Sequence, residues 1–140
     1  MLSVLAAAVI HVAVVAALLA GLPHRTISAT DEHGVTAQYG GVALRDVLTQ
    51  QGVPTGEALR GDVMTRYVVV DAADGYRVVF SLSELDPSIT DRVVLIADTR
   101  DGAALSAHDG PYQLIVPGDK HQKRWVREVT AIDVEDAPPL

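Results

Sequence analysis

The most informative stretch of the chain reads Gly110-Pro111-Tyr112-Gln113-Leu114-Ile115-Val116-Pro117-Gly118-Asp119-Lys120, and Arg124-Trp125-Val126 follows it closely. Aromatic and β-branched residues predict a strand over residues 112–116, which the Pro-Gly pair ends. Trp125 begins a second apolar run, which predicts a final strand to Val134. We expect the Trp125 indole to anchor the core, because large aromatic rings are usually buried. The stretch therefore predicts two strands joined by a polar loop.

Further strands are predicted before this stretch. Val93 to Ala97 is a continuous apolar run, typical of a strand buried on both faces, and Asp98 to Gly102 predicts a turn after it. Tyr67 to Val70 and Tyr76 to Phe80 are β-rich runs. The Asp74-Gly75 pair between them is a strong signal for a hairpin.

Helices are predicted at two places. Apolar residues at helical spacing predict a helix from Ala43 to Gln51, which Gly52 is placed to cap. Ser81 and Glu84 form the pattern of a capping box, which predicts a short helix that ends before Pro87. The sequence therefore contains few helices, and those are short.

The rest of the chain completes the predicted fold class. Thr26 to Ala37 predicts two short strands around a turn, and Pro54 to Gly61 predicts a loop with a short helical turn. Six or seven strands with two or three short helices, without a βαβ rhythm, predict an α+β domain built on a mixed β-sheet. We assign residues 22–135 to this domain and residues 136–140 to a tail.

Composition excludes several classes of function. The 11 basic and 18 acidic residues give a formal net charge of −7, which disfavours nucleic acid as a partner because a phosphate backbone requires a basic face. The chain has no cysteine, which excludes disulfides, thiolate nucleophiles and iron–sulfur clusters. No feature of the composition identifies a protein partner.

Residues 1–21 form an apolar N-terminal segment without a charged side chain. Its length suits the roughly 30 Å hydrocarbon core of a bilayer, so it is interpreted as a secretory signal or a membrane anchor. The chain is then periplasmic, or is anchored through residues 1–20 and faces the periplasm. The alternatives are a buried helix, or a start codon placed within a longer cytoplasmic chain. A basic residue before the run and a strong cleavage site, both typical of a signal, are missing.

The loop after Gly118 is locally basic on an acidic chain. Lys120, His121, Lys123 and Arg124 fall within five residues, and such a cluster can hold a small anion such as a phosphate. The alternative is a solvated hairpin loop without a ligand. We take Lys120, His121 and Arg124 as the main candidates for binding.

Other motifs of catalysis or metal binding lack support. The five histidines are dispersed, and none pairs with another at the spacing of metal ligands on one element. Asp98 and Asp101 resemble half of a calcium loop, but the closing glutamate is missing. No nucleophile elbow and no glycine-rich phosphate loop occur. The sequence therefore predicts no metal site and identifies no catalytic residue.

Several segments, in order, resemble the molybdopterin-binding domain of the sulfite-oxidase family. Leu19 to Pro23 is similar to a helix end inside that domain, and Tyr39 to Leu48 is similar to its aromatic-x-Gly-Val-Pro-Leu-Arg-Asp-Leu-Leu motif, with Ala43 in place of proline. Residues 110–118 resemble Gly-x-Pro-x-Arg-Leu-x-Val-Pro-Gly. Residues 73–80 and 83–87 are closest to small bacterial single-domain members. The resemblance covers roughly residues 22–134.

The resemblance implies a cofactor, but the chain lacks the cysteine that binds the metal of that cofactor. In the catalytic members a cysteine holds molybdenum after a strand that corresponds to about residues 26–29, whereas this chain has Thr30, Asp31 and Glu32 at that point. A hard oxygen ligand does not reproduce a thiolate. We therefore expect that molybdopterin is a candidate ligand and that molybdenum is doubtful.

Three functions follow from the resemblance. The first is a non-catalytic or vestigial extracytoplasmic binding module for a small anion or a pterin, in which Arg45 and Arg66 are weaker candidates for binding. The second is a molybdopterin-dependent oxidoreductase in which Asp31 or a water replaces the thiolate. The third is a structural or interaction domain whose basic loop binds nothing.

Overall fold

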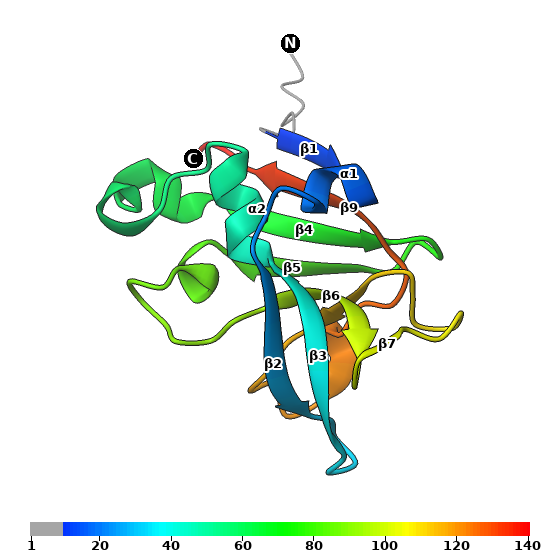
Figure 1. Ribbon diagram of the computed structural model, residues 1–140. Helices are drawn as coiled ribbons and strands as arrows, with labels where there is room; N and C mark the ends of the chain where they lie inside the picture. Colours follow the sequence, from blue (N-terminus) through cyan, green and yellow to red (C-terminus); the bar gives the residue numbers. More distant parts are fainter. Residues whose placement is uncertain (1–9) are drawn as a thin grey trace.

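Two β-sheets form the framework of the protein, whose computed structural model describes residues 10–140 (Figure 1). The first sheet has the order β1-β9-β4-β5, with β1 (Ile10–Ala13), β4 (Tyr67–Ala72), β5 (Arg77–Ser81) and β9 (Val129–Glu135). The second has the order β2-β3-β6-β7, with β8 also beside β6; its strands are β2 (His24–Thr30), β3 (Thr36–Ala43), β6 (Leu95–Arg100), β7 (Ala103–Ala104) and β8 (Gln113–Ile115).

The helical elements are short, as the sequence predicts. They are α1 (Ala16–Leu19), α2 (Leu44–Gln50) and the 3₁₀ turns η1 (Gly56–Ala58), η2 (Gly61–Thr65), η3 (Ser83–Leu85) and η4 (Gln122–Arg124). The predicted α+β class is confirmed. Every strand pair among residues 10–140 is antiparallel, a regularity that the sequence did not predict.

Residues 10–19 of the apolar N-terminal segment lie in the folded domain. β1 pairs with β9 from Ile10 opposite Val134 to Ala13 opposite Ala131, and Leu19 of α1 is buried. Within residues 10–140, no helix combines the length and the apolar character that crossing a membrane requires. Residues 1–9, the rest of the predicted signal or anchor, lie outside the described part of the chain.

Two predicted boundaries were wrong. β6 continues to Arg100, because Thr99 and Arg100 pair with both β3 and β7, so the turn is made by Asp101 and Gly102 alone. Both have positive φ, 49° and 81°, as a two-residue hairpin turn of this kind requires. β9 begins at Val129 rather than at Trp125.

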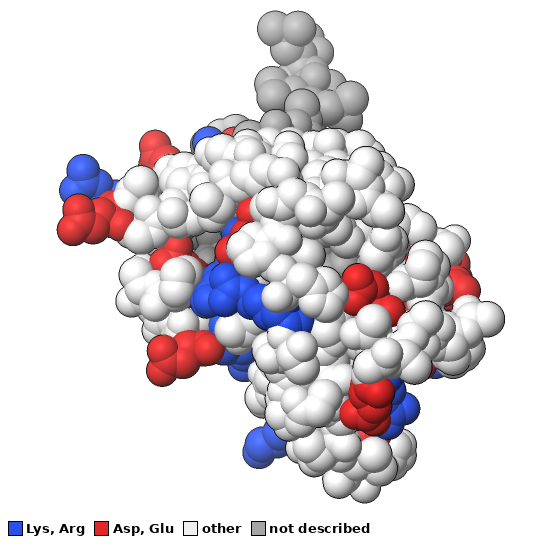
Figure 2. All heavy atoms as spheres, viewed as in Figure 1, with Lys and Arg blue, Asp and Glu red and all other residues white. Residues whose placement is uncertain are grey.

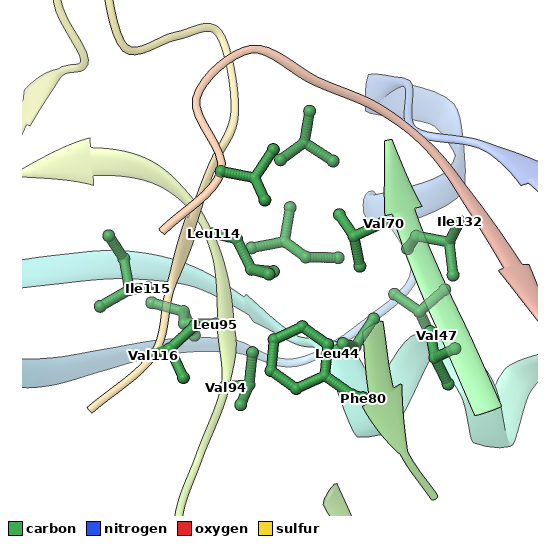
Figure 3. Packing of buried hydrophobic residues seen from close by; sticks show 14 of the residues in the cluster. Leu44, Val47, Val70, Phe80, Val94, Leu95, Leu114, Ile115, Val116 and Ile132 are labelled. Atoms are coloured by element: carbon green, nitrogen blue, oxygen red, sulfur yellow. The ribbon is translucent and has the colours of Figure 1, made fainter. Parts of the chain in front are cut away.

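The core lies between the two sheets. Phe80 of β5, Leu44 of α2 and Leu95 of β6 are fully buried, and Figure 3 shows the labelled side chains of this cluster pointing into the space between the strands. The buried face of α2 carries Leu44, Val47 and Leu48, which explains why helical spacing identified it correctly. The predicted capping box also forms, since Ser81 N–H donates to Glu84 at 2.8 Å.

Close packing of β3 on β6 depends on two glycines. The register between these strands shifts at Gly40 and Gly41, and a Cβ added to Gly41 would lie only 2.0 Å from the carbonyl oxygen of Ile96. No side chain can be accommodated at that distance without moving a backbone. The glycine pair therefore sets how closely the two strands approach.

We expect Gly41→Ala to destabilise the fold by about 3 kcal/mol, the upper end of what overpacking a core costs. Gly21→Ala is the matched control, because a Cβ there meets no atom within 4 Å. Urea unfolding followed by circular dichroism measures both. Equal midpoints for the two variants would contradict the close approach at Gly41.

Candidate functional site

A pocket with a volume of about 460 Å³ lies where the turn after β2 meets the segment around η4. One wall carries Asp31 and Glu32, and the opposite wall carries Gln122, Lys123 and Arg127. His121 and Glu32, which are 89 positions apart in the sequence, are in contact beside the pocket, since His121 Nδ1 lies 3.2 Å from a carboxylate oxygen of Glu32. The structure thus brings together the point of the missing cysteine and the predicted basic loop.

The turn after β2 is built by the side chain of Asp31. One carboxylate oxygen accepts the backbone N–H of His33 at 2.8 Å and that of Val35 at 2.9 Å. The hydrogen bond from Val35 is the main reason that the pKa of Asp31 is lowered; loss of solvation opposes it, and the hydrogen bond from His33 adds to the lowering. Asp31 is therefore ionised at neutral pH and is partly engaged in the turn.

Three aromatic residues line the pocket, Tyr39, Tyr76 and Trp125, and two of their rings are in contact. Tyr39 of β3 meets Trp125 edge to face, with ring centroids 5.8 Å apart and an interplanar angle of 89°. The Trp125 indole donates to the carbonyl of Val116 at 3.0 Å, and only 5% of the residue is exposed. The guanidinium of Arg100 lies 6.0 Å from the Tyr39 ring centroid. Trp125 therefore anchors the core, as predicted, and also shapes the pocket.

Two residues of the pocket are mostly buried but present polar atoms to it. Tyr39 is 6% exposed and Gln113 is 8% exposed, and neither the phenol nor the carboxamide hydrogen-bonds to another group in residues 10–140. Burial raises the pKa of Tyr39, which keeps its hydroxyl protonated and able to donate. No buried side-chain nitrogen or oxygen atom in residues 10–140 lacks a hydrogen-bond partner, so the unpartnered polar atoms of Tyr39 and Gln113 are open to the pocket and can contact a ligand there.

The pocket carries charges of both signs. Its cations are Arg100, Lys123 and Arg127, and its carboxylates are Asp31, Glu32, Asp74 and Asp109. Within the described chain Arg127 contacts His108, whereas Arg100 and Lys123 form no ion pair. The arrangement suits a ligand that has an anionic group and also hydrogen-bond donors.

Arg124 is held by an internal network next to the pocket. Its Nε and Nη2 donate to the two carboxylate oxygens of Asp119 at 2.9 and 3.1 Å, and its Nη1 donates to Glu84 at 2.9 Å. Its guanidinium also lies 4.3 Å from the ring centroid of Phe80. The network raises the pKa of Arg124, and the hydrogen bond from Arg124 lowers the pKa of Asp119.

The other four predicted binding residues lie at different places. Lys120 is exposed in the loop, and His121 contacts Glu32 at the pocket rim. Arg66 pairs with Asp136 of the tail at 2.9 Å, away from the pocket. Arg45 lines a separate cavity of about 100 Å³ beside α2. Figure 2 shows a compact group of basic atoms near the start of α2, with acidic atoms scattered around it.

Comparison with known proteins identifies the domain. Residues 16–139 match the model of the oxidoreductase molybdopterin binding domain. The chain belongs to this family. No curated protein matches the sequence. The family binds the molybdopterin cofactor, so the pocket can be tested against that group.

The pocket fits the organic part of the cofactor better than its metal. The buried phenol of Tyr39 and carboxamide of Gln113 can hydrogen-bond a heterocycle, and Arg100 and Lys123 can hold a phosphate. No thiolate is present, and residues 10–140 contain no group of three or more His, Asp or Glu placed to hold a metal ion. The donors at this point are carboxylates, which differ from the thiolate in softness.

Sequence reasoning missed most residues of the pocket. Arg100 and Gln113 lie in strands β6 and β8, where alternation indicates burial rather than function. Tyr39 begins the motif that carried the family resemblance, but the motif did not reveal that its ring meets Trp125. The sequence offered one signal for a pocket residue, which was the charged Arg100 at the end of an apolar strand, next to a turn.

We expect the Asp119–Arg124 pair to make stability depend on pH. Because the folded-state pKa of Asp119 is lowered from 3.8, the pair stabilises the fold above about pH 4, and this contribution is lost as the pH falls through the folded-state value. Asp119→Asn should cost about 2 kcal/mol at pH 7 and less at pH 2 to 3. Urea unfolding at both pH values measures the difference, and an equal loss at each would contradict this assignment.

Proposed function

We propose that this domain binds molybdopterin, or a closely similar phosphorylated heterocycle, without molybdenum-based oxygen transfer. The proposal rests above all on the pocket wall, where Tyr39 and Gln113 present polar atoms that form no hydrogen bond within residues 10–140, beside the cations Arg100 and Lys123. Polar atoms of this kind favour a ligand with donors and acceptors on a planar edge. The membership of the family supports the same ligand class.

The carboxylates of the pocket also favour this ligand over a simple anion. Asp31, Asp74 and Asp109 would repel a sulfate or phosphate ion alone, but they can accept hydrogen bonds from the amino and ring N–H groups of a pterin. The cations would then hold the phosphate at the other end. Lys120 and His121 at the outer side of the loop remain candidates for contributing charge there.

The non-catalytic role follows from the donor set. A thiolate is what holds molybdenum in the catalytic relatives that the sequence resembles, and the corresponding turn here carries Asp31 and Glu32. We therefore propose a binding module rather than a sulfite-type oxidase. We further propose that it works outside the cytoplasm. The uncharged apolar residues 1–9 support an export segment, whereas residues 10–19 of the same apolar run belong to the folded domain.

One alternative is an oxidoreductase in which a carboxylate or a water replaces the thiolate. The position of Asp31 in the pocket wall favours this alternative, since one of its oxygens accepts no hydrogen bond from residues 10–140. A purely structural domain is a further alternative, favoured by the ion pairs that already engage Arg124.

We expect natively purified protein from a host that makes the cofactor to carry a pterin and little molybdenum. Fluorescence of the oxidised pterin and elemental analysis of the same sample measure the two separately. Stoichiometric molybdenum would instead support the oxidoreductase. Protein without any pterin would favour the structural domain.

We expect Arg100→Gln and Lys123→Gln each to lower pterin occupancy about tenfold, because each removes one charge-assisted hydrogen bond to a phosphate. Arg60→Gln is the control, since Arg60 is exposed and does not line the pocket. Pterin content per chain is compared at equal salt concentration. An equal loss for all three variants would indicate a general effect of charge rather than a site.

A further inference from the structure

Arg124 joins three separate parts of the chain through a single guanidinium. It donates to Asp119 in its own loop, to Glu84 of η3 and, at 3.2 Å, to the backbone carbonyl of Val79 in β5. Four of its five N–H groups are thereby used. Only 26% of its side chain is exposed, and little of its hydrogen-bonding capacity is left for a ligand.

The contact with β5 uses a backbone group that has no strand partner. β5 is the edge of the first sheet, and it pairs with β4 so that Val79 lies opposite Val69. Ala72 and Tyr76 form a hydrogen-bonded pair, because the Ala72 N–H donates to the carbonyl of Tyr76. Hydrogen-bonded and non-hydrogen-bonded pairs alternate along an antiparallel ladder, so Val69 and Val79 are a non-hydrogen-bonded pair. The backbone N–H and carbonyl of Val79 therefore point away from β4. Arg124 therefore holds the loop against the open edge of the sheet.

Glu84 completes the same attachment from the other side. One of its oxygens accepts Arg124, and the other accepts the backbone N–H of Ser81 at 2.8 Å. The edge strand is thus bound at Val79 by the cation and at Ser81 by its counter-ion. An ion pair with both partners fixed to the backbone loses less side-chain entropy on forming than an ordinary surface pair.

The attached loop includes a cation of the pocket. Lys123 precedes Arg124 and lines the pocket, and its carbonyl accepts the hydroxyl of Tyr76. The buried Trp125 follows Arg124, and its backbone N–H donates to the carbonyl of Gln122 at 3.1 Å. Movement of Arg124 away from β5 would therefore move Lys123 relative to the wall formed by Tyr39.

We propose that Arg124 is a positioning residue, which places Lys123 in the pocket by fixing the loop to the edge of β5, and that it does not bind the ligand directly. This inference rests on the proposed function for the role of Lys123. From its charge, the sequence predicted that Arg124 binds the ligand, whereas here it positions another residue. The attachment itself exists whether or not the pocket binds a pterin.

Hydrogen exchange tests the attachment without any ligand. In the full chain, Arg124→Gln and Arg124→Lys should both speed amide exchange at Ser81 and residues 122–125 at least tenfold, because lysine cannot make the fork of bonds to Asp119, Glu84 and Val79. Arg60→Gln should leave these rates unchanged. Unchanged rates in both Arg124 variants would overturn the proposal.

Binding of inorganic phosphate, followed by NMR, separates positioning from direct contact. Glu84→Gln removes a competing carboxylate, so phosphate should bind more tightly if Arg124 is a ligand and several-fold more weakly if Arg124 only positions Lys123. Arg124→Lys should also weaken binding although the charge is kept. The double variant Arg124→Gln with Lys123→Gln should bind no more weakly than Lys123→Gln alone. Tighter binding by Glu84→Gln, or additive losses in the double variant, would overturn the proposal.

A parent chain that binds no phosphate would count against the proposed function. The exchange rates would still decide whether Arg124 fixes the loop, so the two failures are distinguishable. If Arg124→Gln does not fold, Glu84→Gln carries the test through both measurements, since it leaves the contacts with Asp119 and Val79 in place.

Discussion

The hydrogen bond from the buried Trp125 indole to the carbonyl of Val116 is the contact on which the pocket depends. This bond closes the loop that follows β8, so residues 117–124, between Val116 and Trp125, must project at the surface. The same indole also meets Tyr39, which lies on β3 of the second sheet, in an edge-to-face contact. One side chain therefore fixes the spacing between the loop and the strand that form two walls of the pocket. An unsatisfied indole N–H at 5% exposure would be costly, which makes this arrangement strongly preferred.

Local signals in the sequence predicted those elements that are decided by neighbouring residues. The hairpin at Asp74-Gly75, the helix beginning at Leu44 and the capping box at Ser81 were all placed correctly, because each depends on contacts within a few residues. β1 could not be predicted in this way. Its four residues, three of them apolar, lead to α1 without a turn signal, and only pairing with β9, more than one hundred residues away, makes them a strand.

The candidate site was predicted less completely for a related reason. A count of charges identifies the basic loop, but it cannot show which cations are neutralised by residues distant in the sequence. Glu84 lies 40 positions from Arg124 and engages it, whereas Arg100 and Lys123 form no ion pair within residues 10–140. Counter-ions and burial, both products of the tertiary structure, decide which charges can reach a ligand. The family resemblance supplied the cofactor class, which no count of charges provides.

The turn after β2 explains how the fold can persist without the metal ligand of its relatives. A carboxylate at Asp31 accepts two backbone N–H groups and so holds the turn in place by itself. A thiol is a much weaker acceptor, so a cysteine at this residue would leave these amides to water or to a bound cofactor. The resemblance placed the cysteine of the catalytic members at about residues 30–32, and Asp31 stabilises the turn at that point. The core, the Trp125 anchor and the Arg124 attachment likewise consist of contacts within residues 10–140 and need no metal, so the pocket keeps its shape through the chain's own side chains.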